Sequence, residues 1–201
     1  MWRALSVALL TAPFVQAADL VVERLPIAGQ PVQEIFAIER EPGGALWIGT
    51  SDGLYRYDGQ RFTRVGADSD GLRSQNAGLL ALDPDGSLWV GTWGGGLHRV
   101  DLASRRVERI ELPADKIQSA IFDAAGTLYV GTAEHGLFRR SSPVAFEHVQ
   151  ASGQWRIWDL CQQGSVIYLA LDGGLARLEG EDWQFWSAET GNPHGFDHRQ
   201  L

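Results

Sequence analysis

The sequence predicts an all-β fold, a β-propeller of four-stranded antiparallel blades. Three observations predict it. A short phrase, in which an aromatic residue precedes an aliphatic residue, Gly and Thr, recurs with a period near forty residues. Short apolar segments separated by Gly- and Asp-rich turns flank each copy. No segment sustains the 3.6-residue apolar period of a helix. This period with strand-like content is typical of propeller blades, whereas solenoid coils are shorter and a sandwich would not repeat so literally.

The recurring phrase fixes the phase of four repeats. Its lead aromatics, which stand 42, 40 and 39 residues apart, are Trp47, Trp89, Tyr129 and Tyr168. We expect each one to wedge between adjacent blades from the second strand. Gly49, Gly91 and Gly131 follow at positions where we expect close approach of the backbone. The fourth copy has Ala170-Leu171 in place of Gly-Thr, but its phase is unchanged.

Each repeat divides into four candidate strands. The first repeat gives 35–38, 46–50, 54–58 and 61–65. The second gives 78–82, 88–92, 97–101 and 106–110. The third gives 117–122, 128–132, 137–140 and 146–149. The fourth gives 155–160, 166–171, 175–178 and 183–186. Turn sequences such as Asp58-Gly59 separate the strands, as hairpins require.

The start of the chain has the layout of a secretory signal peptide over residues 1–17. Arg3 gives a positive start, residues 4–10 are apolar, and Val15-Gln16-Ala17 offers a cleavage site. An uncleaved signal anchor is the alternative. We therefore expect an exported protein, on the periplasmic face of a membrane receptor.

Four blades are expected to form an incomplete ring. The expected boundaries are an outer strand and linker at 18–33, blades at 34–66, 67–112, 113–150 and 151–187, and a linker to a missing blade at 188–201. Residues 20–25 read as an outer strand without a blade before it, yet the fourth repeat has its own outer strand. Because propellers have about four to eight blades, a free-standing four-bladed ring with a loose tail is the alternative.

Charge disfavours two classes of partner. The chain has 17 Lys and Arg against 25 Asp and Glu, and loss of the signal segment removes Arg3 from the basic residues. Nucleic-acid binding needs a basic surface, and a polybasic membrane patch is also absent. We expect no nucleic-acid partner, and membrane contact only through a span downstream of this sequence. Cys161 is the single cysteine, so no internal disulfide can form.

The repeats closely resemble the two-component regulator propeller family. The resemblance rests on phrases such as 83–92, Asp-Pro-Asp-Gly-Ser-Leu-Trp-Val-Gly-Thr, and covers four repeats over about 34–186. It implies a periplasmic sensor region that precedes a membrane span and an output module, a hybrid histidine kinase or a diguanylate cyclase. It also implies dimerisation through the parent receptor, which we expect to be truncated here before the output module. A propeller enzyme of the lyase type and a protein-interaction scaffold remain alternatives.

Ligand contacts are expected where the repeats differ, in the turns between second and third strands. These turns share one rim with the interblade linkers, and loops on a rigid scaffold commonly carry binding. The candidate residues are Asp52, Trp93, Glu134, His135 and Asp172. Trp93 is the sharpest candidate, because an aromatic side chain on a glycine-rich turn can stack on a flat small ligand such as a carbohydrate; packing against the next blade is the alternative. The linker residues Arg73, Gln75 and Asn76 are weaker candidates.

No catalytic set, metal site or cofactor site is expected. His194 and His198 are four residues apart, but the Gly and Pro residues around them oppose a helical metal pair. One arginine recurs per blade, at Arg56, Arg99, Arg139 and Arg177. A ring of arginines suggests anion binding, but recurrence at one position favours a structural role, in which each arginine pairs with an acid or lies along the neighbouring sheet.

Overall fold

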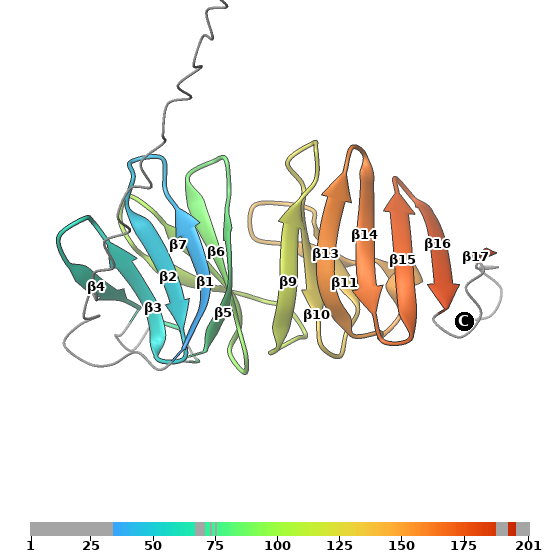
Figure 1. The fold of residues 1–201 in the computed structure, drawn as a ribbon, viewed down its shortest axis with the longest axis horizontal. Helices are drawn as coiled ribbons and strands as arrows, with labels where there is room; N and C mark the ends of the chain where they lie inside the picture. The colour runs from blue at the N-terminus through green and yellow to red at the C-terminus, as the bar shows by residue number, and fades with distance from the viewer. Residues whose placement is uncertain (1–33, 67–70, 73, 75, 188–192, 196–201) are drawn as a thin grey trace, which may run out of the picture.

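The computed structural model describes residues 34–66, 71–72, 74, 76–187 and 193–195 (Figure 1). The expected signal peptide, the expected strand at 20–25, and Arg73 and Gln75 lie outside these residues. The described residues form four antiparallel sheets that follow one another along the long axis of the molecule, from blue to red in Figure 1. Apart from the single 3-10 turn η1 (Gln150–Ser152), the described elements are all strands.

Each sheet is one sequence repeat, with its strands in chain order. The first contains β1 (Ile35–Arg40), β2 (Leu46–Thr50), β3 (Gly53–Tyr57) and β4 (Phe62–Val65). The second contains β5 (Ala77–Leu82), β6 (Ser87–Thr92), β7 (Gly96–Asp101) and β8 (Val107–Ile110). The third contains β9 (Ile117–Phe122), β10 (Leu128–Thr132), β11 (Leu137–Arg140) and β12 (Phe146–His148). The fourth contains β13 (Ile157–Gln163), β14 (Val166–Leu171), β15 (Gly174–Glu179), β16 (Asp182–Ser187) and β17 (Pro193–Gly195).

All sixteen expected strands are present, with ends that differ by a few residues at most. One element differs in kind. Within residues 188–201, which were expected to be a linker to a missing blade, β17 pairs with β16 and adds a fifth strand to the last sheet. Three residues with Pro and Gly at their ends carry no alternating pattern, so the sequence could not predict this strand. The predicted propeller of four-stranded blades is confirmed.

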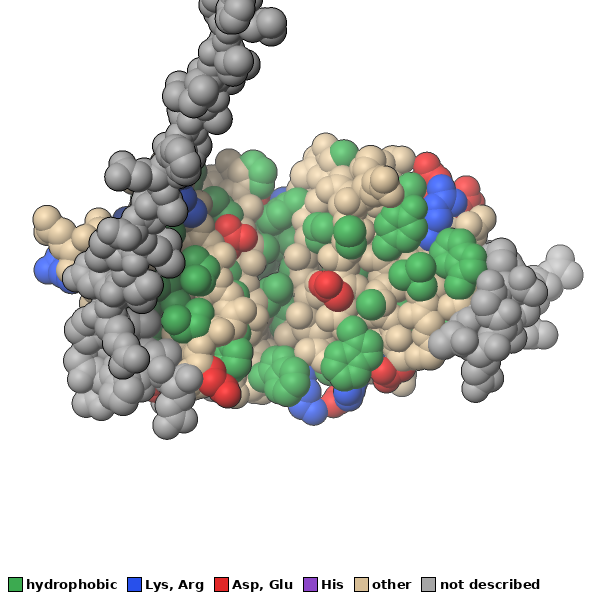
Figure 2. Space-filling model, in the orientation of Figure 1, with side chains coloured by type: hydrophobic (Ala, Val, Ile, Leu, Met, Phe, Trp, Pro, Cys, Tyr) green, Lys and Arg blue, Asp and Glu red, His purple; other side chains and the backbone are tan. Residues whose placement is uncertain are grey.

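The sheets meet through their innermost strands. β1 lies against β5, β5 against β9, and β9 against β13. Among the described strands, the first and last innermost strands, β1 and β13, share no comparable contact. The exposed Ile38 on β1 and Leu175 on β15 lie on the two end sheets, and Figure 2 shows apolar side chains spread over β13–β16. The described sheets therefore form an arc with two apolar ends.

Three of the four lead aromatics, Trp47, Trp89 and Tyr129, fill the gaps between sheets, as expected. Trp47 is fully buried in a cluster with Leu80 and Leu88 of the second sheet. Trp89 is fully buried against the third sheet, and its ring meets that of Phe146 edge to face with centroids 5.6 Å apart. Tyr129 is buried in a cluster with residues of the fourth sheet. Tyr168, in the last sheet, is only half-buried. The aromatic positions therefore supply the core between successive blades.

The glycines of the repeated phrase stand where the next blade approaches closely. A Cβ on Gly49 would lie 2.3 Å from the backbone oxygen of Ala77. A Cβ on Gly91 would lie 2.7 Å from Ile117 Cγ2, and one on Gly131 would lie 2.6 Å from Ile157 Cγ2. In the first three blades, the second strand thus needs a glycine because the innermost strand of the following blade passes beside it.

Candidate functional site

One edge of the molecule is built from the same contact in every blade. The turn between the second and third strands donates a backbone hydrogen bond to the residue that immediately precedes the innermost strand of its own blade. The four bonds are Ser51 N to Glu34 O (3.1 Å), Trp93 N to Asn76 O (3.2 Å), Ala133 N to Lys116 O (3.1 Å) and Asp172 N to Arg156 O (3.2 Å). Each turn is therefore fixed beside an innermost strand, and we call this edge the rim.

Each innermost strand has a β-bulge just below the rim. The strand pairing skips one residue in each blade, and the skipped residues are Phe36, Gly78, Gln118 and Trp158. A bulge leaves one residue unpaired and changes the direction of its side chain. Four equivalent positions at the rim thus carry four chemically different residues.

Trp93 is exposed yet firmly held. Half of its side chain, 51%, is accessible to solvent. Its indole Nε1 donates to Gln118 Oε1 of the third sheet at 3.1 Å, and its carbonyl accepts from Ser74 Oγ at 2.9 Å. It also forms a β-bridge with Lys116. An exposed aromatic side chain that is already fixed loses little conformational entropy when a ligand stacks on it.

A cavity of about 560 Å³ opens beside Trp93. Its lining residues come from the first three blades and are Glu34, Phe36, Asn76, Gly78, Trp93 and Gln118. The volume lies in the range of small-molecule sites. The lining offers two aromatic rings, two carboxamides and one carboxylate, with no cationic side chain among these six residues. Gln118 uses Oε1 to accept from Trp93, so the other polar atom of its amide, Nε2, is a donor.

Asp52, on the rim of the first blade, is engaged in contacts within its own blade. Its Oδ2 accepts from Tyr55 Oη at 2.8 Å, and Arg64 donates to its backbone oxygen at 2.6 Å. Burial, followed by the bond to Asp52, raises the pKa of Tyr55 above its usual range. Asp52 does not line the cavity beside Trp93.

Glu134 and His135 lie together at the rim of the third blade. They line a small cavity of about 160 Å³ with Lys116, whose Nζ donates to Glu134 Oε1 at 2.7 Å. This hydrogen bond, with the charge of Lys116, lowers the pKa of the exposed Glu134 carboxylate. The backbone N–H of His135 donates to Thr132 Oγ1 at 3.0 Å. Glu134 and His135 lie on the rim turn of the blade that follows the blade of Trp93, but they line a separate cavity.

Asp172 lies at the rim of the fourth blade and holds another exposed tryptophan. Its Oδ1 accepts from Trp158 Nε1 at 2.7 Å. The guanidinium carbon of Arg156 lies 4.8 Å from the centroid of the Trp158 ring, in cation–π range. The fourth blade therefore repeats the arrangement of the second, an exposed indole fixed by a polar side chain.

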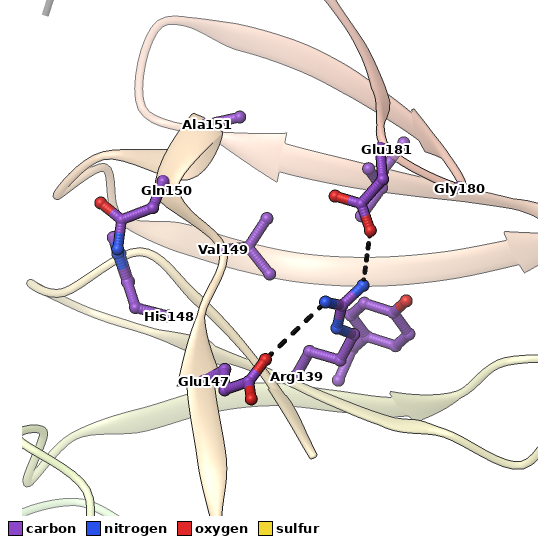
Figure 3. Close-up of a pocket in the computed structure, with 10 residues that line it drawn as sticks. Arg139, Glu147, His148, Val149, Gln150, Ala151, Gly180 and Glu181 are labelled. Carbon is purple, nitrogen blue, oxygen red and sulfur yellow. Dashed lines mark hydrogen bonds and ion pairs between the residues drawn. The ribbon is translucent and has the colours of Figure 1, made fainter. Parts of the chain in front are cut away.

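A second cavity, of about 410 Å³, lies between the third and fourth sheets (Figure 3). Figure 3 shows Arg139 between Glu147 and Glu181, at distances of 3.8 Å and 2.9 Å. Burial raises the pKa of Tyr129, which also lines this cavity. Two carboxylates beside one guanidinium leave no excess positive charge, so this cavity does not favour an anion.

The recurring arginines are paired with acids, as the structural interpretation requires. Arg56 pairs with Glu41, Arg99 with Asp85, Arg139 with Glu181, and Arg177 with Glu179. Glu41 and Asp85 come from the turn between the first and second strands of their own blades, Glu181 from a turn of the following blade, and Glu179 from the same strand as Arg177. The sequence could therefore predict the pairing but not the partner.

Part of the rim could not be predicted from the turns alone. Phe36, Gln118 and Trp158 are bulge residues of innermost strands. The signal that could have found them is their common place, one residue after the apolar Ile or Ala that opens each innermost strand. The sequence does not show a bulge directly, because the extra residue is visible only in the pairing with the second strand.

Among the residues that the structure describes, no group of three or more His, Cys, Asp and Glu side chains could hold a metal ion. None of the described segments forms a helix long and apolar enough to span a membrane.

Comparison with known proteins supports the fold. A family model described as the SMP-30/Gluconolactonase/LRE-like region matches residues 55–134, less than half of the chain. No curated protein matches the chain in sequence. Among solved structures, the chain is similar to the extracellular domain of a proposed hybrid two-component system, BT3049 from B. thetaiotaomicron, with a TM-score of 0.67 and 19% identity over 88% of this chain.

Two other solved structures are similar. Virginiamycin B lyase from Staphylococcus aureus has a TM-score of 0.60 and 13% identity over 83% of this chain. The computationally designed Ika4 protein has a TM-score of 0.56 and 14% identity over 80% of this chain, and 99% of its own length is covered. The chain spans about a quarter of the BT3049 domain (26%) and 59% of the lyase. The resemblance to sensor propellers is thus confirmed at the level of the fold, which enzymes share.

Proposed function

We propose that this chain is the extracytoplasmic ligand-sensing part of a bacterial signal-transduction receptor, and that its ligand binds on Trp93. The parent is a hybrid histidine kinase or a diguanylate cyclase, exported by the segment at residues 1–17 and attached to the membrane by a downstream span. The fold of the BT3049 extracellular domain supports this assignment.

One observation carries the proposal: Trp93 is half exposed although residues of two blades hold it in place. Nε1 of Trp93 is held by Gln118 of the third blade, and the backbone is held by Ser74 and Asn76. A fold gains little stability from ordering an exposed indole in this way. A binding platform, by contrast, gains affinity, because the platform is organised before the ligand arrives.

The lining of the cavity indicates the chemistry of the ligand. A flat apolar face would stack on Trp93 or Phe36, and hydroxyl groups would meet the carboxamides of Asn76 and Gln118. Glu34 accepts hydrogen bonds and repels anions. These properties suit a neutral small molecule with a flat face and several hydroxyls, such as a carbohydrate fragment.

Signalling follows if the ligand binds one arrangement of the blades more tightly than another. The cavity is lined by three blades, so a ligand there links the first, second and third sheets. Only such a differential affinity can shift an equilibrium between two states. In the parent receptor, the shift would change the geometry of a homodimer and reach the output module.

The proposal is tested by isothermal titration calorimetry of the chain. The probes are methyl pyranosides, neutral di- and trisaccharides, and the corresponding uronate-bearing oligosaccharides. The variants are Trp93→Ala and, as a matched control with similar exposure on an outer turn, Val144→Ala. We expect a neutral saccharide to bind and Trp93→Ala to weaken binding about 30-fold, the loss of a hot-spot side chain worth about 2 kcal/mol.

Three results would contradict the proposal. Equal affinity of the Trp93→Ala variant would show that binding occurs elsewhere. Tighter binding of the acidic probes would contradict the chemistry of the cavity. Chemical turnover of a bound saccharide by this chain would favour an enzyme.

A further inference from the structure

We infer that Gly78 sets the size of the cavity beside Trp93 and so determines which ligands fit there. The statement about ligands rests on the function proposed above, whereas the statement about the cavity does not. Gly78 is a residue of the cavity lining, and it occupies the bulge of β5.

The other three blades provide an internal comparison. The residues equivalent to Gly78 are Phe36, Gln118 and Trp158, each of which has a large side chain. Two of them, Phe36 and Gln118, line the same cavity as Gly78. Of the four described blades, the second is the one whose bulge residue has no side chain. The cavity opens at this blade.

Neither the backbone nor the packing requires a glycine at position 78. Its φ lies outside the left-handed region, and a Cβ built on it would meet only Trp93 Cδ1, at 4.0 Å. By contrast, a Cβ on Gly91, in the repeated phrase, would come within 2.7 Å of Ile117. Glycine within a strand is unfavourable by about 0.5–1 kcal/mol relative to alanine. Close approach of a ligand is a known reason for such a glycine.

The position of Gly78 relative to Trp93 explains how it would select ligands. Its α-carbon lies beside the indole, since the added Cβ would lie 4.0 Å from Cδ1 of that ring. A methyl group there would narrow the cavity, and a branched side chain would cover the ring on which a ligand stacks. Gly78 therefore permits a ligand that reaches past the indole into the cavity, whereas a larger residue would restrict binding to a small ligand at its mouth.

The cavity statement is tested without any ligand. The chain is labelled with 5-fluorotryptophan, and the Trp93 resonance is assigned from its loss in Trp93→Phe. The accessibility of Trp93 is then measured as the ¹⁹F line broadening caused by the small nitroxide TEMPOL. We expect Gly78→Leu to reduce this broadening at least two-fold.

The matched control is Gly43→Leu, at the turn between β1 and β2. Gly43 and Gly78 share two properties: neither has a left-handed φ, and neither would have a Cβ contact below 3.4 Å. Gly43→Leu should leave the broadening at Trp93 unchanged. Unchanged broadening in Gly78→Leu would overturn the inference. If that variant does not fold, Gly78→Ala serves instead, with a smaller reduction and a melting temperature at or above that of the wild type.

A second arm tests selection among ligands by calorimetry with a methyl pyranoside and a neutral trisaccharide. Gly78→Ala should weaken the trisaccharide at least ten-fold and the methyl pyranoside less than three-fold. Equal weakening of both probes would overturn the statement about selection. If neither probe binds the wild type, the proposed saccharide ligand is wrong, while the nitroxide measurement still decides whether Gly78 holds the cavity open.

Discussion

Arg140 of the third sheet pairs with Asp83 of the second sheet across the indole of Trp89. Asp83 Oδ2 also accepts from Trp89 Nε1 at 3.0 Å, and the guanidinium carbon of Arg140 lies 5.6 Å from the indole centroid. Asp83 is 5% exposed. The aromatic residue that fills the gap between these two blades is therefore also the centre of a polar link between them.

Removing the charge of Asp83 should loosen this link. Asp83→Asn leaves the Arg140 guanidinium without its partner in a mostly buried place, so we expect the free energy of unfolding to fall by about 3 kcal/mol. Urea titration measures it. The matched control is Asp85→Asn, because the Asp85–Arg99 pair is more exposed and should contribute less than about 1 kcal/mol. Equal effects of the two substitutions would contradict the prediction.

Stability should fall in acid because Asp83 must become protonated. Burial raises the pKa of Asp83, but the hydrogen bonds from Trp89 and Arg140 outweigh burial, so the pKa lies below its ordinary value. A carboxyl with a lowered folded-state pKa stabilises the fold above its unfolded pKa, and that stability is lost as the pH falls through the folded value. Thermal melts between pH 7 and pH 2 should show a loss below about pH 4. The loss should be smaller in Asp83→Asn; an identical acid profile would disprove the role of Asp83.

The lead aromatics should differ in importance according to whether a blade follows them. Trp89→Ala opens a cavity between two sheets and should cost about 3–5 kcal/mol. Tyr168→Ala, at the half-buried end position, should cost less than half as much. Denaturant titration of both variants tests this ranking. A larger loss of unfolding free energy in Tyr168→Ala would contradict the role of the lead aromatics as the core between successive blades.

The glycines of the repeated phrase should not tolerate a methyl group. A Cβ on Gly49 would lie 2.3 Å from the carbonyl oxygen of Ala77 on β5, a backbone atom that cannot move alone. We expect Gly49→Ala to destabilise the fold by about 1–3 kcal/mol. In Gly43→Ala the nearest atom would be Glu41 Oε1 at 3.6 Å, an ordinary van der Waals distance, and the melting temperature should stay within a few degrees of the wild type. A wild-type melting temperature for Gly49→Ala would contradict the close approach.

Comparison of the repeats predicts one part of the candidate site and misses another. Trp93 was predictable, because it lies in a turn that varies between repeats while the residues on both sides of the turn are repeated. The cavity beside it was not, because its lining combines side chains from β1, β5 and β9. These strands are separated by about forty residues each, and only their packing brings them together.

The sequence by itself determined the strands, their grouping into four blades, and the burial of the lead aromatics Trp47, Trp89 and Tyr129. These follow from local patterns, since alternation, turn residues and a forty-residue period act within one blade or between neighbours. Only the tertiary structure decided the bulges, the short strand β17, and the meeting of Trp93, Gly78 and Gln118. Bulges depend on the register between paired strands, and cavities depend on the distances between blades, and neither quantity is carried by the order of residues along one strand.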